Sequence, residues 1–155
     1  MTGRLAGVAI LLLAAALIWL STLHSGQAQT EDCALEPYAA FQAEQLPRLR
    51  LEVARTPTEQ SVGLMYRSEL AADAGMLFVY EVLTSGGFWM HNTYIPLSIA
   101  FVEPDGTINT ILDMQPQTDD IHLPARPYLY AIETNQGWYA QNGVRMGDTV
   151  RLCYE

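Results

Sequence analysis

The segment from Gly87 to Leu97, GFWMHNTYIPL, gathers aromatic rings, an imidazole, an amide and a hydroxyl within a few positions. Asn92 and Thr93 directly follow an aromatic stretch, where their side chains can hydrogen-bond to nearby backbone groups. This local role is the favoured interpretation, because buried polar side chains usually satisfy such groups. The alternative is the mouth of a pocket that holds a sugar or another small polar ligand. Its candidate residues are Trp89, His91, Asn92, Thr93 and Arg67.

Two acidic residues in apolar surroundings suggest a second kind of chemistry. Glu133 follows the apolar run YLYAI, so it either faces solvent or is buried and paired with Arg67 or Arg126. Asp113, beside Met114, allows the same two readings. If Glu133, Asp113 and His91 met in one cleft, raised carboxyl pKa values could support acid–base hydrolysis. These three residues are the catalytic candidates of a hydrolase.

Methionine and histidine side chains offer a third possibility, because thioether and imidazole groups suit copper(I). No Met-x-Met or His-x-x-Met spacing occurs, and methionines within apolar strands usually fill the core. Core packing is therefore favoured, and copper handling is kept as an alternative with Met90, Met114 and His91 as candidate ligands. No catalytic triad, phosphate loop, dinucleotide fingerprint or zinc spacing is present, so no cofactor is expected.

The elements that would position these side chains are mostly strands. The alternating segment RLRLEVAR, residues 48–55, predicts a half-buried strand. A short helix follows, with Thr56 as its cap, Pro57 in the first helical position and Glu59 completing a capping box. We expect this helix to end near Tyr66 or Arg67 and to bury Val62, Met65 and Tyr66.

From Gly75 onward, short apolar runs alternate with turns rich in Gly, Pro and Asp. The strands predicted from these runs are residues 76–80, 88–90, 97–102, 107–114, 128–134 and 149–154. Residues 103–106, EPDG, predict a hairpin between the third and fourth of them. The pattern predicts a mainly β, single-domain sandwich or barrel with one short helix near its start.

The beginning of the chain has the three parts of a secretory signal: Arg4, an apolar run from Leu5 to Leu20, and small residues before a cut ahead of Gln29. The run is slightly shorter than the ~20 residues of a membrane-spanning helix, so an uncleaved anchor is the rival interpretation. Residues 1–28 are thus expected to be a signal peptide or an anchor, 29–47 a lead-in, and 48–155 the β domain. The domain is expected to be periplasmic or secreted, or held at the inner membrane through residues 5–20.

The composition of the chain limits the classes of partner that we expect it to bind. The sequence has 17 Asp and Glu against 8 Lys and Arg, a formal net charge of −9, which disfavours nucleic acid and anionic membranes. A small molecule or an envelope component is the expected partner. Cys33 and Cys153 form a lone pair that predicts a disulfide in an oxidising compartment.

Five stretches, in this order, are similar to the bacterial and archaeal family named domain of unknown function 192: 63–67 (GLMYR), 75–78 (GMLF), 87–97, 113–116 (DMQP) and 147–148 (GD). The resemblance spans roughly residues 49–153. The sequence departs from the family pattern at Ser98, where an acid is usual, and at Thr134, where an apolar residue is usual. The resemblance implies a small, mainly β fold with a short helix, and it implies no reaction.

Taken together, the sequence favours a non-catalytic binding or interaction module of the cell envelope, with a polar and aromatic site near residues 88–94. The hydrolase and the copper-handling protein remain the alternatives.

Overall fold

The computed structural model describes residues 36–41 and 48–154. These residues form a mainly β domain of seven strands and two short helices, which confirms the expected fold class. The elements, in chain order, are β1 Tyr38–Phe41, β2 Leu49–Ala54, α2 Pro57–Val62, β3 Ala74–Thr84, β4 Leu97–Val102, β5 Ile108–Met114, β6 Tyr128–Asn135, α3 Trp138–Gln141 and β7 Val150–Cys153.

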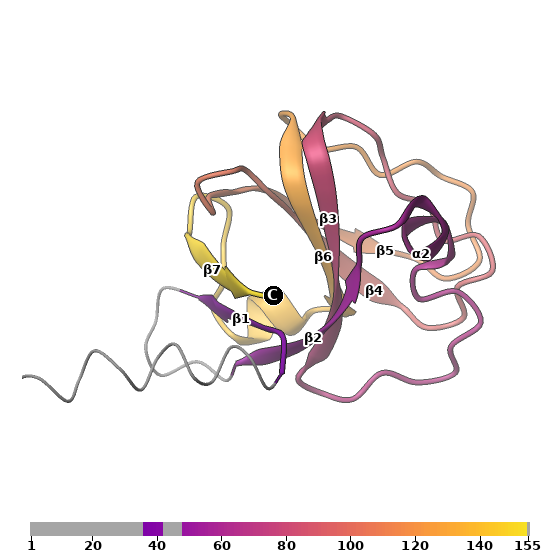
Figure 1. Ribbon diagram of the computed structural model, residues 1–155. Coiled ribbons are helices and arrows are strands. Elements are labelled where there is room, and N and C mark those ends of the chain that lie inside the picture. Colours follow the sequence, from indigo (N-terminus) through magenta and orange to yellow (C-terminus); the bar gives the residue numbers. More distant parts are fainter. Residues whose placement is uncertain (1–35, 42–47, 155) are drawn as a thin grey trace, which may run out of the picture. The chain divides into compact units, whose positions relative to one another are not determined.

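All seven strands belong to one curled sheet, in the order β5-β4-β6-β3-β2-β1-β7 (Figure 1). β2 and β3 are parallel and are connected through α2, whereas every other neighbouring pair is antiparallel. The expected hairpin is present as β4 and β5. An isolated bridge joins Thr107 to Thr149, so the two outer strands approach each other at one end of the sheet.

The sheet has an apolar core on each face. The α3-side core contains residues of α3 together with inward residues of the sheet: Ala39, Phe41, Leu49, Leu51, Leu77, Ala100, Val102, Ile108, Ile132, Trp138, Tyr139, Val144 and Val150. The α2-side core takes the alternate strand positions and residues of the loops: Ala54, Leu64, Met76, Phe78, Met90, Ile95, Leu97, Ile99, Phe101, Met114, Tyr128 and Ala131. Since successive side chains of a strand point to opposite faces, neighbouring residues of β6 belong to different cores.

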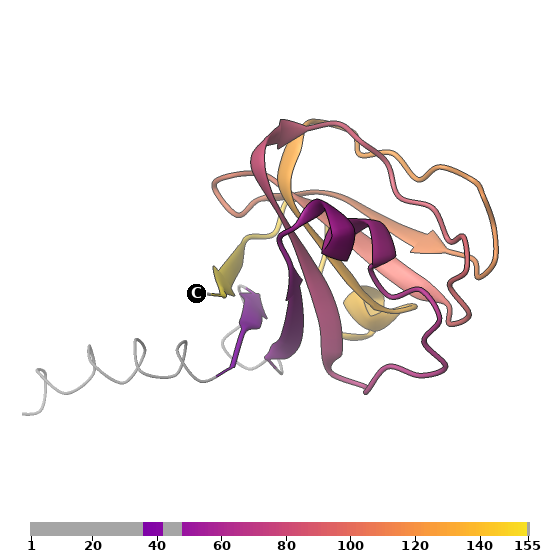
Figure 2. The ribbon, with the colours of Figure 1, turned by 45° about the vertical axis from the view of Figure 1, so that its right-hand side comes forward.

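Two long loops, 85–96 and 115–127, lie beside each other on the side of the domain that is far from β1 and β7 (Figure 2). The backbones of Phe88 and His122 exchange hydrogen bonds of 3.0 and 2.7 Å, and Met90 N–H donates to the Thr118 carbonyl at 3.0 Å. These bonds hold the aromatic segment in place without a continuous strand.

Three expectations about the elements were wrong. Residues 88–90 form no strand, because only Phe88 makes a bridge. The first helix ends at Val62, because Gly63 leaves the helical conformation with φ of 49°. None of the residues of this helix is buried. Residues expected as lead-in contain strand β1, which pairs with both β2 and β7.

Several expectations fall outside the described residues. These are the signal or anchor of residues 1–28, most of the lead-in, and Cys33. Cys153 is buried on β7, opposite Tyr38, and its bond to Cys33 stays a prediction. Within residues 36–41 and 48–154, no helix is long and apolar enough to cross a membrane.

Candidate functional site

Glu133 lies near the middle of the sheet, on β6, opposite Met76 of β3 and Ile99 of β4. Both neighbours belong to the α2-side core, so the carboxyl group is placed among apolar side chains on that face. Glu133 as a whole residue is only 4% exposed. Burial disfavours the charged form and raises the pKa of Glu133 from 4.5 to about 8, so that the carboxyl is mainly protonated at neutral pH.

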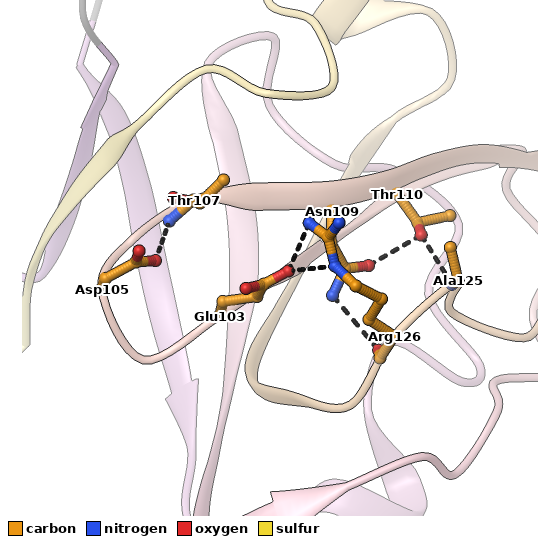
Figure 3. A network of polar contacts seen from close by, with 7 residues as sticks. All are labelled: Glu103, Asp105, Thr107, Asn109, Thr110, Ala125 and Arg126. Atoms are coloured by element: carbon orange, nitrogen blue, oxygen red, sulfur yellow. Dashed lines mark hydrogen bonds and ion pairs between the residues drawn. The ribbon is translucent and has the colours of Figure 1, made fainter.

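The expected pairing of Glu133 with an arginine was wrong. Arg67 makes two hydrogen bonds to Glu52, at 2.7 and 2.6 Å, and Arg126 pairs with Glu103 (Figure 3). Both arginines reach carboxylates nearer the solvent, where a charge needs less desolvation. Among the described residues, Glu133 has neither an ion pair nor a side-chain hydrogen bond.

The helix α2 and the turn after it cover the Glu133 carboxyl. The predicted capping box is present: the Thr56 hydroxyl accepts from Glu59 N–H, and the Glu59 carboxylate accepts from Thr56 N–H. The Gln60 amide donates to the Val79 carbonyl at 2.6 Å and so fixes the helix against β3. These contacts position the helix although it buries none of its side chains.

Gly63 allows the chain to pass close to the carboxyl. A methyl group at this position would lie 3.2 Å from Cζ of Phe78 and 3.9 Å from Oε2 of Glu133. The φ of 49° and ψ of −130° also disfavour any other residue. Gly63 therefore keeps open the space between the turn and Glu133.

The opposite side of this space is formed by the segment 88–93. The turn after α2 is joined to it twice: Tyr66 N–H donates to the Asn92 carbonyl at 2.8 Å, and the Asn92 amide donates to the Tyr66 hydroxyl at 2.9 Å. Tyr66 and Asn92 both have positive φ, 63° and 54°, which fits an irregular path held by hydrogen bonds. Thr93 is buried, and its hydroxyl donates to the His91 carbonyl at 3.3 Å.

Together these segments enclose a narrow cleft with a volume of about 30 Å³. Its lining joins four parts of the chain: residues 60–65, Phe78 on β3, the segment 88–93, and Glu133 on β6. The residues are Gln60, Ser61, Val62, Gly63, Leu64, Met65, Phe78, Phe88, Trp89, Thr93 and Glu133. We call this the Glu133 cleft.

The comparison with known families identifies one family whose model covers most of the described residues. The model of the family called domain of unknown function 192 (DUF192), described as an uncharacterized ACR, matches residues 39–152. This chain belongs to the DUF192 family. No curated protein matches it.

Two solved structures are similar to this DUF192 chain. One, from Sinorhizobium meliloti 1021, carries the provisional description of transcription regulator; it is 34% identical, has a TM-score of 0.70, and the match covers 76% of this chain and 92% of that one. The other is a protein of unknown function from Novosphingobium aromaticivorans DSM 12444, 35% identical, with a TM-score of 0.67 and coverage of 75% and 83%.

The residues predicted for a ligand site separate into two groups. Trp89 and Thr93 line the Glu133 cleft. His91, Asn92 and Arg67 do not line it. The ring of His91 stacks on Trp89 with centroids 5.0 Å apart and its Nδ1 lies 2.8 Å from Asp119. The side chain of Asn92 bonds to the distant Tyr66 hydroxyl and not to nearby backbone, whereas Thr93 makes the local bond to backbone that the sequence favoured.

The three hydrolase candidates do not share a cleft. Asp113 lies opposite Ser98, whose other neighbour is Thr134, so Asp113 and Glu133 point to opposite faces of the sheet. The Ser98 hydroxyl donates to Asp113 and accepts from Gly137 N–H at 2.8 Å. Ser98 and Asp113 line a separate, wider hollow beside α3, with Tyr139, Arg145 and Met146 among its other residues.

The copper candidates are also separated by their environments. Met90 and Met114 are fully buried in the α2-side core, whereas His91 lies at the surface beside Asp119. Met90 and Met114 therefore have the packing role that the sequence favoured.

The sequence did not identify Gly63 and Phe78 as parts of the site. Gly63 was noted only as part of a family stretch, although a glycine that ends a capped helix early could have indicated a close approach. Phe78 appeared only as part of an apolar strand. Its place beside Glu133 follows from the pairing of β3 with β6, which residue spacing alone does not give.

Proposed function

We propose that this DUF192 domain is a non-catalytic module that binds a small ligand in the Glu133 cleft. The observation that supports it is the carboxyl group of a sheet residue that is only 4% exposed, which has no hydrogen-bond partner among the described residues and opens to solvent at the base of an aromatic-lined cleft. A buried acid costs folding free energy, so a position of this kind is more often maintained for binding than for stability.

The polar and aromatic character of the opening fits this role. Trp89 is 47% exposed and can contact a ligand from the solvent side, while Thr93 and Glu133 offer polar groups deeper in the cleft. A few polar groups within an apolar lining are the usual composition of small-molecule sites.

The proposed place of action is the periplasm or the cell exterior, supported by the signal-like residues 1–28. Fractionation of cells that express the full chain, with mass spectrometry of its N-terminus, tests this. An envelope product that begins at Gln29, or one that retains residues 1–28 in the membrane, is expected. A full-length chain in the soluble cytoplasm would contradict export.

The acid excess of the chain disfavours nucleic acid as a partner, so gene regulation is not part of the proposal. The provisional description as a transcription regulator belongs to the Sinorhizobium meliloti protein and is not carried over to this chain.

The binding proposal is tested by ligand-observed NMR with a panel of small polar and amphiphilic metabolites added to the purified full chain. We expect at least one compound to bind, and we expect Gly63→Ala to weaken that binding at least tenfold, because the added methyl group points into the cleft.

Gly143→Ala is the matched control. Gly143 also has a positive φ, 70°, but a methyl group added there would have no atom within 4 Å. Near-ultraviolet circular dichroism shows whether both variants keep the fold. Equal binding by the wild-type chain and a folded Gly63→Ala variant would rule out the Glu133 cleft as the binding site.

A further inference from the structure

The Glu133 cleft has a charge pattern that specifies its ligand more closely. Among the described residues, the carboxyl is the only acidic group in the lining, and no lysine, arginine or histidine lines the cleft. The two arginines that could have neutralised it are bound to Glu52 and Glu103. A cationic group of a ligand would complete this site as an ion pair.

The aromatic side chains favour the same kind of ligand. Phe78 and Phe88 lie edge to face with ring centroids 4.9 Å apart, and Trp89 lines the opening. Aromatic faces attract ammonium and guanidinium groups, most strongly where water is excluded. A carboxyl group in a cleft that is also lined by three aromatic side chains is therefore better matched to a cation than to a neutral sugar.

The size of the cleft limits the cation. A volume of about 30 Å³ admits a group comparable to one or two water molecules. An –NH₃⁺ head has that size, whereas a trimethylammonium head or a planar guanidinium is larger. At the rim, Val62 and Trp89 are both 47% exposed and offer apolar surface for a hydrocarbon chain.

We infer that the ligand of the Glu133 cleft is a primary alkylammonium, with its charged head at the Glu133 carboxyl and its alkyl chain against Val62 and Trp89. This inference rests on the proposed function. The same chemistry occurs in free small amines and in a lysine side chain, and the two sources are separated in the experiment below.

Binding of the cation requires the ionised carboxyl, so the ligand displaces the proton of Glu133. Two other titratable groups interact electrostatically with Glu133, Tyr80 of β3 and Tyr139 of α3, and burial raises the pKa of both tyrosines above 10. Among these three groups, Glu133 is thus the one that changes charge between pH 7 and 9. With a pKa of about 8, its ionised fraction rises about eightfold between pH 7 and pH 8.5.

The experiment titrates n-butylammonium and its neutral counterpart 1-butanol into the purified full chain, followed by amide chemical shifts in NMR. We expect n-butylammonium to bind at least tenfold more tightly than 1-butanol and to bind about eightfold more tightly at pH 8.5 than at pH 7. Calorimetry at pH 7 in two buffers of different ionisation enthalpy should show the release of close to one proton. N-acetyl-lysine methylamide is the third probe: tighter binding than n-butylammonium identifies a lysine side chain as the source, and weaker binding identifies a free amine.

Glu133→Gln should abolish both the preference for the cation and the proton release. Asp113→Asn is the matched control, because it removes one carboxylate from the hollow on the other face and should leave binding unchanged. Equal binding of n-butylammonium and 1-butanol in the cleft would overturn the ammonium inference while leaving a small-ligand site. Absence of binding by both butyl probes, with a compound of the metabolite panel still bound in a manner sensitive to Gly63→Ala, would also overturn the inference alone.

Discussion

Glu133 lies among apolar side chains, an environment that disfavours a charged carboxylate. It lies on a central strand, and burial raises the pKa of its carboxyl to about 8. In the unfolded chain the same group has an ordinary pKa near 4.5. Between these two values the folded protein holds a proton that the unfolded chain has released, so the stability contributed by Glu133 declines as the pH rises through this window.

The resulting prediction concerns Glu133→Gln, which keeps the shape of the side chain and removes its titration. The free energy of unfolding of the variant, relative to the wild-type chain, should increase by about 3 kcal/mol from pH 5 to pH 8. Urea denaturation at several pH values between these limits measures the difference. Parallel pH profiles for the two proteins would show that the carboxyl ionises equally in both states.

The sequence identified individual residues of the Glu133 cleft better than it predicted which residues lie together there. Trp89, Thr93 and Glu133 were each named from their local patterns, and all three line the cleft. Their association with Gly63 depends on contacts between residues 26 to 70 positions apart, which no local periodicity encodes. The same limit explains the wrong assignment of Asp113 to the group, since its face of the sheet follows from strand register.

At the level of elements, the cleft is made by segments that have little regular structure. The turn after α2 and the loop 85–96 are linked through Tyr66 and Asn92, and the loop 85–96 is in turn linked to the loop 115–127. The end of the loop 115–127 is attached to the β4–β5 hairpin by a polar network (Figure 3). Distant support of this kind fixes the position of the residues that contact a ligand.

Thr110 is the central member of that network. Its hydroxyl accepts from Ala125 N–H at 2.8 Å and donates to the Asn109 amide oxygen at 2.7 Å, in a buried position. Thr110→Val should lower the free energy of unfolding by about 1–3 kcal/mol, because both partners lose a hydrogen bond. Denaturant unfolding at pH 7 measures the loss, and faster hydrogen exchange of the Ala125 amide shows its location.

Arg126→Gln serves as the comparison within the same network. It removes the ion pair with Glu103, in which the Arg126 side chain is 62% exposed, and should cost less than ~1 kcal/mol. If Arg126→Gln were the more damaging of the two, the ion pair and not the buried hydroxyl would hold the loop.

Sequence patterns predicted the regular elements well where amphipathic alternation or capping signals were present. β2, the capping box of α2 and the β4–β5 hairpin were all found in the expected places. The exceptions have physical causes. The helix α2 stops early at Gly63, and the backbone of residues 88–90 hydrogen-bonds to the loop 115–127 and not to a neighbouring strand.

For the whole molecule, the sheet brings the two ends of the domain together. β1 pairs with β7, and Cys153 of β7 lies opposite Tyr38 of β1. Tyr38 comes five positions after Cys33 in the sequence. The predicted disulfide between Cys33 and Cys153 would add a covalent link at this end of the sheet.

If this bond forms, Cys153→Ser should lower the free energy of unfolding of the oxidised chain by on the order of 4 kcal/mol, since the bond closes nearly the whole domain into a loop. Denaturant unfolding with and without reductant measures the effect. In reductant the two proteins should differ by less than ~1 kcal/mol, as expected for a single conservative change. Equal stability of both proteins without reductant would indicate that the bond is absent.

The pairing of β1 with β7 also affects when the domain can be completed. β7 follows the other described strands in the chain, and the longest part of the β1 ladder, from Tyr38 to Phe41, forms only with it. Contacts of such high sequence separation form late, because a long loop must close first. A nascent chain that lacks residues 150–153 therefore holds an unfinished sheet, in which β1 keeps only its short pairing with β2 and its other edge stays open.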